Sequence, residues 1–538
     1  MLLWPGPRLL LAAALVAAGC AVSAPQIRDV RPPSVGALDD RVTLQLRLPS
    51  ETHYDRRSAV VTSGDATLVL PLLAAAAESL GRTALESDRQ INRAALEICR
   101  GLRRSGPPSA RLVDFALRSA GMTDPPPHLL VVELPQGGGI DVSQLRERLL
   151  ALLKQGAYRR VGVARCQPQL TPDRWRLVIA LCESPLRFQP LPRSWQLGRS
   201  AELRLRTLAG HRDLRLVYVT PAGRIVEAPM RAFAGGRFSA PFGCGHQGMY
   251  RVEITGIGRL GTEVLANFPI YCAVRPPHQV SYQRSHFGVT SRQELERRIA
   301  DLVDEQRRRV GLADLVRLDN LSAVARRHSE RMRDERFVGH VTPNGEQPQD
   351  RLRAANIAFS VARENVARAY SAEEAMSELM NSPAHRANIL AQDIDAIGVG
   401  VAIERRPDVP VLFVSQEFIK QPLQVAPAEF VRRLLEAANR YRIERNVALL
   451  KRSERLDQLA AGYLLDGGNS NAEQARQRLK SAAQRLGRYR AIVGVLATAS
   501  VPGDLARAAE LVDANFLRVG FAARRGASGY VIAFVLAR

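Results

Sequence analysis

The sequence predicts an α+β protein that is divided into several domains. A chain of 538 residues has room for three or four domains of ordinary size. Apolar residues recur at helical spacing, followed by short apolar strands, in three parts of the chain. Residues 189–275 instead alternate polar and apolar side chains with a period of two, which predicts a separate antiparallel β domain.

Residues 1–20 are typical of a bacterial secretion signal. Arg8 precedes an apolar run from Leu9 to Ala18, which is too short to span a bilayer. The run ends in A-A-G-C, which resembles the lipoprotein box, so we expect Cys20 to be diacylated and to become the first mature residue. Ordinary cleavage after Ala24 is the alternative. We therefore expect an exported protein that a lipid holds on the membrane.

The residues after Cys20 give further expectations about location. Ala21, rather than Asp, follows the cysteine, which resembles an outer-membrane address, so we expect the protein to face the periplasm or the cell surface. Residues 21–64 begin with a Pro-rich, polar stretch and are predicted to form a spacer with an irregular start. Pro71 interrupts the apolar run 68–77, which is predicted to be a core segment.

The composition is strongly basic, with a formal net charge of +23 and a pI near 10.7. Only four of the 76 basic residues are lysines, a bias that is typical of a GC-rich genome. Aromatic residues make up 5% of the chain and no nucleic-acid-binding motif is present, so we expect no nucleic-acid partner. Export favours attraction to anionic lipid head groups or cell-wall polymers as the use of this charge.

Five cysteines remain after Cys20, and export permits disulfides. Cys244 and Cys272 are predicted to lie on neighbouring strands of the β domain, so we pair them first. Cys166 and Cys182 flank a predicted hairpin and would pair, leaving Cys99 over; Cys99 with either of them is the alternative. The spacing contains no CxxC, which disfavours a zinc ribbon or a redox motif.

The β domain at residues 189–275 is predicted to be a small immunoglobulin-like sandwich. Alternating runs such as A-E-L-R-L-R-T-L and M-Y-R-V-E-I are separated by turns such as T-P-A-G-R. The segment also has the length of one such domain. Pro276 and Pro277 are predicted to begin a linker to the next domain.

Six motifs between Ala325 and Phe418 contain the candidate site residues. In order they are A-R-R-H-S-E-R-M, F-V-G-H-V-T-P-N-G, R-E-N-V-A, N-S-P-A-H-R-A-N-I-L, I-G-V-G-V-A and F-V-S-Q-E-F. They place His340, Glu364 and His385 in turns among Gly, Pro and Asn residues. Polar side chains held in such turns are what a polar functional site requires.

His385 is predicted to lie in the first turn of a helix. Ser382 is expected to be the N-cap and Pro383 the first helical residue. The positive end of the helix lowers the pKa of His385, so its imidazole would be neutral at pH 7 and able to bind a metal or accept a proton. His328, by contrast, recurs at helical spacing with Ala325, which predicts a packing histidine.

The order of the six motifs resembles the CAP superfamily, also called the SCP domain (cysteine-rich secretory proteins, antigen 5 and plant pathogenesis-related proteins), and especially its bacterial branch. The resemblance covers residues 293–420. It implies a three-layer α-β-α sandwich with a cleft lined by two His and one or two Glu, and by motif these are His340, Glu364 and His385. The second glutamate of eukaryotic members falls near Ser382, so the fourth group is missing.

Three chemical hypotheses follow. In the first, His340, His385 and Glu364 hold a divalent metal such as zinc with an open position, although no H-E-x-x-H helix preorganises them. In the second, Ser382 is a nucleophile with His385 as its base, oriented by Glu364, although no G-x-S-x-G elbow is present. The third is binding without turnover, because the resemblance implies sterol, fatty-acid or partner binding and no shared catalytic activity.

We favour the third hypothesis. The sequence predicts an envelope-anchored, non-catalytic binding protein for a lipid, another small hydrophobic ligand or an envelope component, bound through the His340, Glu364 and His385 cleft. The alternative is a weak metal-dependent hydrolase that acts in the cell envelope. No cofactor other than that divalent metal, zinc, is expected.

Two further segments resemble degenerate copies of the same unit. With an offset of 135 residues, residues 428–538 repeat the apolar pattern of the CAP-like segment, and Leu321 falls on Leu456. Tyr463 replaces His328, and none of the site motifs is repeated. Residues 65–185 show a fainter version of the pattern. We expect degenerate CAP-like α/β domains with a structural or partner-binding role.

Overall fold

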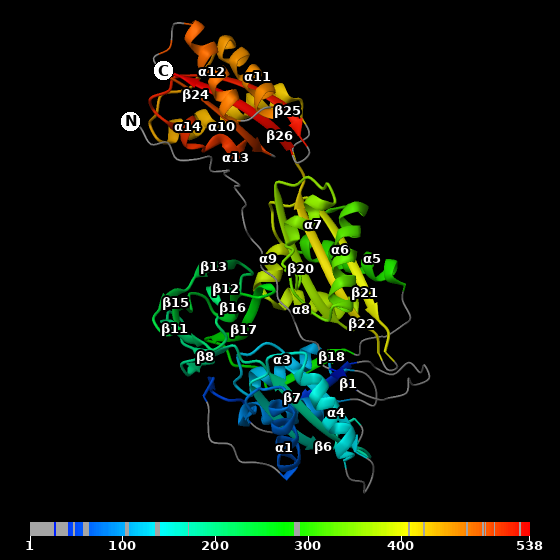
Figure 1. Ribbon diagram of the computed structural model, residues 1–538. Coiled ribbons are helices and arrows are strands. Elements are labelled where there is room, and N and C mark those ends of the chain that lie inside the picture. Colours follow the sequence, from blue (N-terminus) through cyan, green and yellow to red (C-terminus); the bar gives the residue numbers. More distant parts are fainter. Residues whose placement is uncertain are drawn as a thin grey trace.

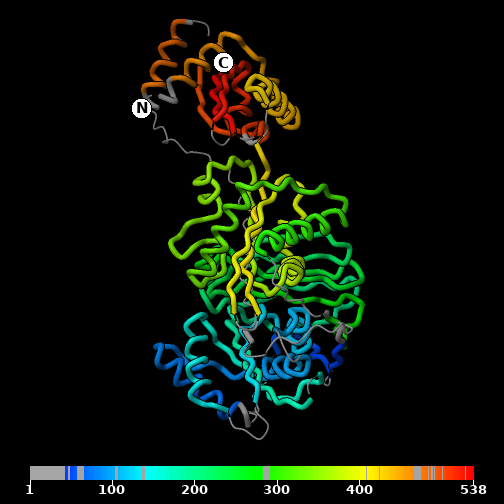
Figure 2. Tube along the Cα trace, turned by 90° about the vertical axis from the view of Figure 1, so that its right-hand side faces the viewer, coloured from blue at the N-terminus to red at the C-terminus, as the bar shows by residue number. Residues whose placement is uncertain are grey.

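Four folded units follow one another in the computed structural model, and Figure 1 shows the C-terminal unit standing apart from the other three. Figure 2 shows the same separation from the side. The structure describes residues 26–27, 41–46, 49–56, 64–102, 107–134, 140–170, 172–283, 291–406, 409–422, 425–469, 472–486, 489, 491–499, 501–526 and 529–538. The predicted secretion signal and Cys20 lie outside these residues. No helix within these ranges is both long enough and apolar enough to cross a bilayer.

The N-terminal unit is a five-stranded sheet between two layers of helices. Its elements are β1 (Gln26–Ile27), α1 (Gly64–Glu78), β4 (Glu86–Ser87), α2 (Arg89–Arg100), α3 (Ala110–Ser119), β5 (His128–Leu134), α4 (Val142–Leu153), β6 (Arg160–Cys166) and β7 (Trp175–Cys182). The strand order is β1-β5-β7-β6-β4. Helices α2 and α3 bury one face of the sheet, and α1 and α4 bury the other. The run 68–77 lies in α1 and contributes to the core, as predicted.

The third unit along the chain has the same three layers. Its elements are α5 (Arg292–Arg308), β19 (Val316–Arg317), α6 (Asp319–Asp334), α7 (Pro348–Ala354), β20 (Val361–Ala369), α8 (Ala372–Asn381), α9 (Pro383–Ile389), β21 (Ala396–Glu404) and β22 (Val411–Lys420). The strand order is β19-β21-β22-β20. Helices α5 and α8 pack on one face, and α6 and α7 on the other. The predicted mixture of helices and strands in this segment is confirmed.

The C-terminal unit repeats this arrangement. Its elements are α10 (Pro427–Glu444), β23 (Lys451–Arg452), α11 (Glu454–Asn469), α12 (Ala472–Leu486), β24 (Ile492–Ala499), α13 (Gly503–Ala506), α14 (Ala509–Val512), β25 (Arg518–Gly526) and β26 (Gly529–Ala537). The strand order is β23-β25-β26-β24. Helix α10, strand β23 and helix α11 each begin 135 residues after α5, β19 and α6.

The three α/β units share one pattern of strand directions. In each, the first short strand runs parallel to the third strand, which forms an antiparallel hairpin with the fourth. The fourth strand then pairs antiparallel with the second. The order is therefore 1-3-4-2 in all three units, with β1 added at one edge of the N-terminal sheet.

A glycine near the start of the third strand lets the second helix of each unit lie directly on the sheet. These are Gly162, Gly398 and Gly520. A Cβ there would lie 2.4, 2.4 and 2.0 Å, respectively, from backbone carbonyl carbons of the helix. Glycine is therefore required at this position, because the backbones approach too closely for any side chain.

Capping side chains fix where several of these helices begin. Asp88 accepts hydrogen bonds from two backbone N–H groups of the first turn of α2. Ser291 and Glu294 form a capping box at the start of α5. Ser371 accepts from the Glu374 N–H at the start of α8. The helices therefore begin at residues whose side chains satisfy otherwise unpaired N–H groups.

The second unit is built from two sheets that share one core and are antiparallel except for the short parallel pairing of β10 with β17. Its strands are β8 (Leu186–Phe188), β9 (Leu191–Pro192), β10 (Ser194–Trp195), β11 (Ser200–Thr207), β12 (Arg212–Val219), β13 (Ile225–Pro229), β14 (Arg231–Phe233), β15 (Arg237–Gly243), β16 (Gly248–Gly258) and β17 (Gly261–Cys272). One sheet has the order β10-β17-β16-β12-β13 and the other β14-β15-β11-β8. Aromatic residues of both sheets meet in the core, including Phe242 and Tyr250 at 5.5 Å between ring centroids. We call this unit the β-sandwich.

The segment predicted to be a spacer contributes strands instead. Strand β1 extends the N-terminal sheet, β2 (Arg41–Gln45) pairs with β18 (Gln279–Gln283), and β3 (His53–Tyr54) pairs with β9. Three short strands thus lie within the segment predicted to be a spacer with an irregular start. Short polar strands at a sheet edge have no strong hydrophobic periodicity, so their sequence resembles that of a linker. The start of the predicted linker at Pro276 is also followed at once by β18.

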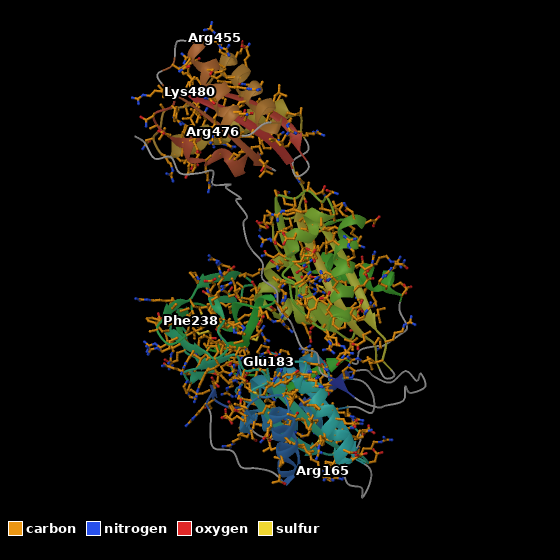
Figure 3. All side chains as sticks on the ribbon, in the orientation of Figure 1. Arg165, Glu183, Phe238, Arg455, Arg476 and Lys480 are labelled. Carbon is orange, nitrogen blue, oxygen red and sulfur yellow. A yellow bond between two sulfur atoms is a disulfide. The ribbon has the colours of Figure 1, made fainter. Side chains whose placement is uncertain are left out.

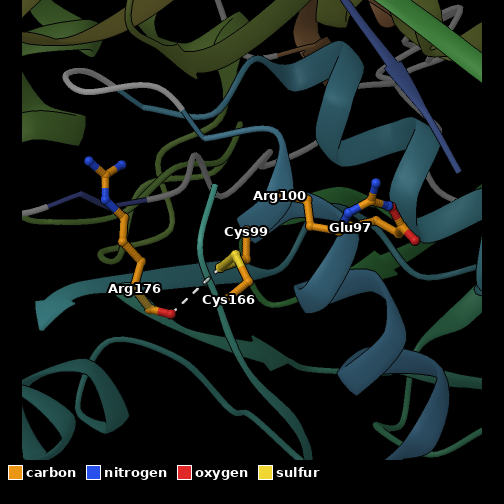
Figure 4. The surroundings of a disulfide bond; sticks show 5 residues. All are labelled: Glu97, Cys99, Arg100, Cys166 and Arg176. Atoms are coloured by element: carbon orange, nitrogen blue, oxygen red, sulfur yellow. Dashed lines mark hydrogen bonds and ion pairs between the residues drawn. A yellow bond between two sulfur atoms is a disulfide. The ribbon is translucent and has the colours of Figure 1, made fainter. Parts of the chain in front are cut away.

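Two disulfides are formed among the described cysteines, and one differs from the first expectation. Cys244 and Cys272 are bonded, as predicted, although they join the two sheets rather than neighbouring strands. Cys166 pairs with Cys99, the alternative pairing, as Figure 4 shows. Cys182 is free and buried. The hairpin pairing was wrong because the antiparallel register places Cys166 opposite Arg176, six residues from Cys182.

Candidate functional site

His340 and Glu364 contact each other directly. His340 lies in the turn that follows α6, and Glu364 lies on β20 in the central sheet. Their Nδ1 and Oε1 atoms are 2.6 Å apart. A positive φ of 56° at Arg336 turns the chain out of α6 toward His340. The structure therefore brings together two of the three residues that the motifs predicted.

Arg351 occupies the other oxygen of Glu364. Its Nη2 donates to Glu364 Oε2 at 2.5 Å, and its Nη1 donates to the His340 carbonyl at 3.1 Å. Burial alone would raise the pKa of Glu364, but the Arg351 guanidinium, His328 and His340 hold it well below its usual value. Glu364 is therefore an ionised carboxylate whose two oxygens both have partners.

A second carboxyl group adjoins Glu364, although the motifs did not predict it. Glu417 lies directly opposite Glu364 in the register of β22 and β20, and its Oε1 is 4.0 Å from Arg351 Nη2. Burial, and then the charge of Glu364, raises the pKa of Glu417 well above its usual value. The available signal was the polar run S-Q-E within the otherwise apolar strand V-L-F-V-S-Q-E-F.

His385 lies in the first turn of α9, where Ser382 is the N-cap and Pro383 the first helical residue, as predicted. The Ser382 hydroxyl makes no capping bond; its Oγ lies 2.8 Å from His385 Nδ1 instead. Burial, and then the charge of His340, lowers the pKa of His385 to about 3. The imidazole is therefore neutral at pH 7, as expected, but burial rather than the helix end is the main cause.

Two asparagines connect His385 to Glu364. Asn365 Nδ2 donates to the His385 carbonyl at 3.2 Å, and Asn388 Nδ2 donates to the Glu364 carbonyl at 3.1 Å. Asn388 also donates to Asn365 Oδ1 at 2.9 Å. These buried bonds hold α9 against β20 and fix the position of the His385 backbone.

The β-sandwich contributes a carboxyl group to the same region. Glu253 of β16 accepts from the Ala384 N–H at 3.0 Å and from Asn267 Nδ2 at 2.9 Å, and it hydrogen-bonds the Ser382 hydroxyl. Asn267 Nδ2 also donates to the Asn381 carbonyl at 3.2 Å. Glu253 thus caps α9 from another unit, a role that no local sequence pattern indicated.

The hairpin between β16 and β17 rests on the His340 turn. The backbone N–H groups of His340 and Val341 both donate to the Leu260 carbonyl at 3.0 Å. A Cβ on Gly339 would lie 2.6 Å from Leu260 Cβ, and one on Gly261 would lie 3.2 Å from His340 Cβ. The hairpin and the turn are therefore in close backbone contact.

The site is buried rather than open to water. His340, Glu364 and His385 expose 1, 2 and 0% of their surface. The β16–β17 hairpin contacts the His340 turn, and Glu253 of the neighbouring β-sandwich contacts the start of α9, so both lie over this region. Contacts between units cannot be inferred from the motif segment alone.

The residues do not fit a metal ion. Glu364 already accepts from an arginine and contacts His340, and a guanidinium beside it opposes a cation. His385 Nδ1 contacts Ser382. Within the described parts of the chain, no group of three or more His, Cys, Asp or Glu side chains is arranged to hold a metal ion. The hypothesis of a zinc site at His340, His385 and Glu364 is therefore not supported by this geometry.

His328 packs in the core, as predicted. It is fully buried on α6, its ring meets Phe337 edge-on at 5.9 Å, and its Nε2 lies 2.9 Å from the Gly339 carbonyl. Burial lowers its pKa to about 4. The same nitrogen is 3.9 Å from Glu364 Oε2, so His328 also lies at the rear of the site.

Residues 300–418 match the sequence profile of the cysteine-rich secretory protein family, CAP. This segment is a CAP domain. Two proteins of Bacillus subtilis (strain 168) are similar to it. The uncharacterized protein YkwD is 34% identical over 106 residues, or 20% of this chain and 41% of that protein. The uncharacterized membrane protein YlbC is 33% identical over 127 residues, or 23% of this chain and 34% of that protein.

This chain thus spans less than half the length of either relative. Among solved structures, an outer surface protein from Borrelia burgdorferi is 22% identical and covers 24% of this chain and 96% of its own, with a TM-score of 0.23. An extracellular protein containing an SCP domain from Bacillus anthracis is 20% identical. The match covers 42% of this chain and 66% of that protein, with a TM-score of 0.22.

Proposed function

We propose that this chain is an exported, lipid-anchored binding protein of the bacterial cell envelope that does not turn its ligand over. The ligand would be a lipid, another small hydrophobic molecule or an envelope component, bound at His340, Glu364 and His385. The A-A-G-C motif at Cys20 supports the anchor. The two disulfides support export, because disulfides persist in oxidising compartments.

The contact between the hairpin and the CAP domain is the observation that carries the proposal. The backbone N–H groups of His340 and Val341 both donate to the Leu260 carbonyl. The surface of the site therefore already binds a backbone segment of the same chain. A ligand reaches the buried His340 and Glu364 only when this hairpin moves. A site that another unit closes suits binding controlled by displacement better than repeated turnover.

The hydrolase alternative has one observation in its favour. Glu364 and Glu417 adjoin, and their surroundings lower the pKa of one and raise that of the other. Two neighbouring carboxyl groups whose pKa values are shifted in opposite directions suit proton transfer. However, the Ser382 hydroxyl lies between the other two groups and contacts both Glu253 and His385. In a catalytic triad the carboxylate instead contacts the imidazole and orients it.

We further propose that the N-terminal and C-terminal units are CAP-like copies that have no such site and serve a structural or partner-binding role. The shared strand order supports this relationship, as does an arginine near the end of the first helix. Arg307 Nη1 donates to the Ile389 carbonyl at 2.9 Å, and Arg442 Nη1 donates to the Leu511 carbonyl at 2.8 Å. Tyr463 stands where the CAP domain has His328.

The test uses the full chain in detergent with a bacterial lipid extract, and with ester and peptide substrates in parallel. We expect the protein to retain bound lipid and to release it on denaturation. We expect no turnover of the ester and peptide substrates. Retention should fall in His340→Ala and rise in Gly339→Ala, which pushes the hairpin away. Gly245→Ala, with open space around its Cβ, is the control. Turnover lost in both His340→Ala and His385→Ala would establish the hydrolase instead.

A further inference from the structure

A cavity of about 850 Å³ lies where the N-terminal unit, the β-sandwich and the CAP domain meet. Its volume is within the range of small-molecule sites. Glu183, which lines it, is labelled at the junction of the first two units in Figure 3. His340, Glu364 and His385 do not line this cavity, so it is separate from the site described above.

Three of the four acidic residues of the cavity wall have basic partners, and the fourth, Glu183, accepts from the Ala157 N–H at 3.3 Å. Asp124 Oδ2 accepts from Arg160 at 2.6 Å, and Glu404 Oε2 accepts from Arg406 at 2.7 Å. Glu263 Oε2 is 3.0 Å from a ring nitrogen of His211. These carboxylates therefore do not neutralise the other basic groups of the wall.

Three arginines of the wall have no carboxylate partner. Arg259 lies at the tip of the β16–β17 hairpin, Arg336 follows α6, and Arg368 is on β20. None of the three has a hydrogen bond or an ion pair within the described ranges; Arg368 lies over the Phe413 ring at 5.6 Å. Arg259 and Arg336 are exposed, whereas Arg368 is partly buried. A partly buried arginine without a counter-charge costs free energy, and a bound anion would reduce that cost.

The N-terminal unit presents an unpaired polar atom to the same space. His128 is 3% exposed, its Nδ1 lies 2.8 Å from the Tyr158 hydroxyl, and its Nε2 has no hydrogen-bond partner. Burial, then the charges of Arg368 and Arg406, lowers the pKa of His128 to about 3. When the tyrosine donates to Nδ1, the His128 proton is on Nε2, which then donates into the cavity.

We propose that this cavity binds a small organic molecule with one anionic group, a carboxylate or a phosphate. Arg368 would hold the anionic group with two parallel N–H donors, and His128 Nε2–H would add a third from the opposite unit. Phe337, Phe413 and Leu260 line the same cavity and would contact the apolar body of the ligand. Because its walls come from three units, bound ligand would also hold these units together.

The test is calorimetric titration of the full chain in detergent with benzoate, phenyl phosphate and inorganic phosphate. We expect benzoate or phenyl phosphate to bind with a dissociation constant below about 1 mM. Arg368→Gln should weaken this binding by about tenfold or more, because a hydrogen bond to a charged group is lost. Arg368→Lys should recover part of it, whereas Arg405→Gln, an exposed neighbour outside the cavity, should leave it unchanged.

Comparison of benzoate with phenyl phosphate shows whether the cavity prefers a carboxylate or a phosphate. Inorganic phosphate tests whether the apolar body of the ligand contributes to the affinity. His340→Ala should bind like the natural chain, since His340 is not in the wall. Without ligand, Arg368→Gln should melt at a higher temperature, because it removes a partly buried charge that has no counter-charge. Failure of all three anions to bind at about 1 mM, or equal weakening in Arg405→Gln, would overturn the proposal.

Discussion

Glu364 and Glu417 form a buried carboxyl pair at the centre of the CAP domain. They face each other on adjacent antiparallel strands, where side chains of opposite residues lie close together. Arg351 is 2.5 Å from one and 4.0 Å from the other. The arginine keeps Glu364 ionised, and the Glu364 charge in turn favours the protonated form of Glu417.

Removal of Arg351 should therefore be strongly destabilising. Arg351→Ala leaves a buried carboxylate without its counter-charge, and we expect a loss of about 3–5 kcal/mol in the free energy of unfolding. The urea midpoint of the CAP domain transition measures this loss. Arg353→Ala removes an exposed arginine of the same helix that pairs with Asp350, and it should cost less than about 1 kcal/mol. Equal effects of the two substitutions would contradict this account.

Glu253 should make stability depend on pH. Burial raises its pKa from an ordinary value near 4.5 to about 7. The folded chain then holds a proton that the unfolded chain releases between these values, so this contribution is complete below pH 4.5 and is lost as the pH rises through 7. Glu253→Gln should reduce the fall in melting temperature between pH 5 and 8. An unchanged pH profile in Glu253→Gln would show that another group is responsible.

At the scale of elements, each α/β unit depends on one helix lying directly on a glycine of the sheet. In the C-terminal unit, Gly520 lies under α11, and an added Cβ would be 2.0 Å from the Leu456 carbonyl carbon. The helix would have to move away from β25, which separates well-packed apolar residues on both elements.

We therefore expect opposite effects from two Gly→Ala substitutions in this unit. Gly520→Ala should destabilise it by about 3 kcal/mol through overpacking. Gly462→Ala, in α11 with open space around the Cβ, should stabilise it by about 0.5–1 kcal/mol because alanine favours the helix. Denaturant unfolding of both variants measures the difference. Similar stability of the two would show that helix and sheet are not in close contact here.

At the scale of the whole molecule, the β-sandwich closes the CAP site through backbone contacts. Gly339→Ala places a Cβ 2.6 Å from Leu260 Cβ and 3.0 Å from the Leu260 carbonyl oxygen. We expect the hairpin to separate from the turn and amide hydrogen exchange at His340 and Val341 to rise by about tenfold. Gly245→Ala should leave these amides protected. Unchanged exchange in Gly339→Ala would mean that the contact survives the substitution.

Some of the site was predictable because it depends on local spacing. The motif F-V-G-H predicted a histidine in a turn, and S-P-A-H predicted the start of α9. The motif R-E-N also placed Glu364 in a turn, but Glu364 lies on strand β20. Glu417 was missed because its importance depends on the register of β22 against β20. Arg351 was missed because a single arginine in a basic chain gives no signal.

The sequence by itself determined the mixture of helices and strands in residues 293–420, the alternating strands of the β-sandwich, and the pairing of Cys244 with Cys272. These features follow from spacing within a few residues or from alternation along one strand. Only the tertiary structure decided that Cys99 bonds Cys166, that Glu417 adjoins Glu364, and that Leu260 covers His340. Such contacts join residues far apart in the chain, and they depend on strand register and on how whole units pack together.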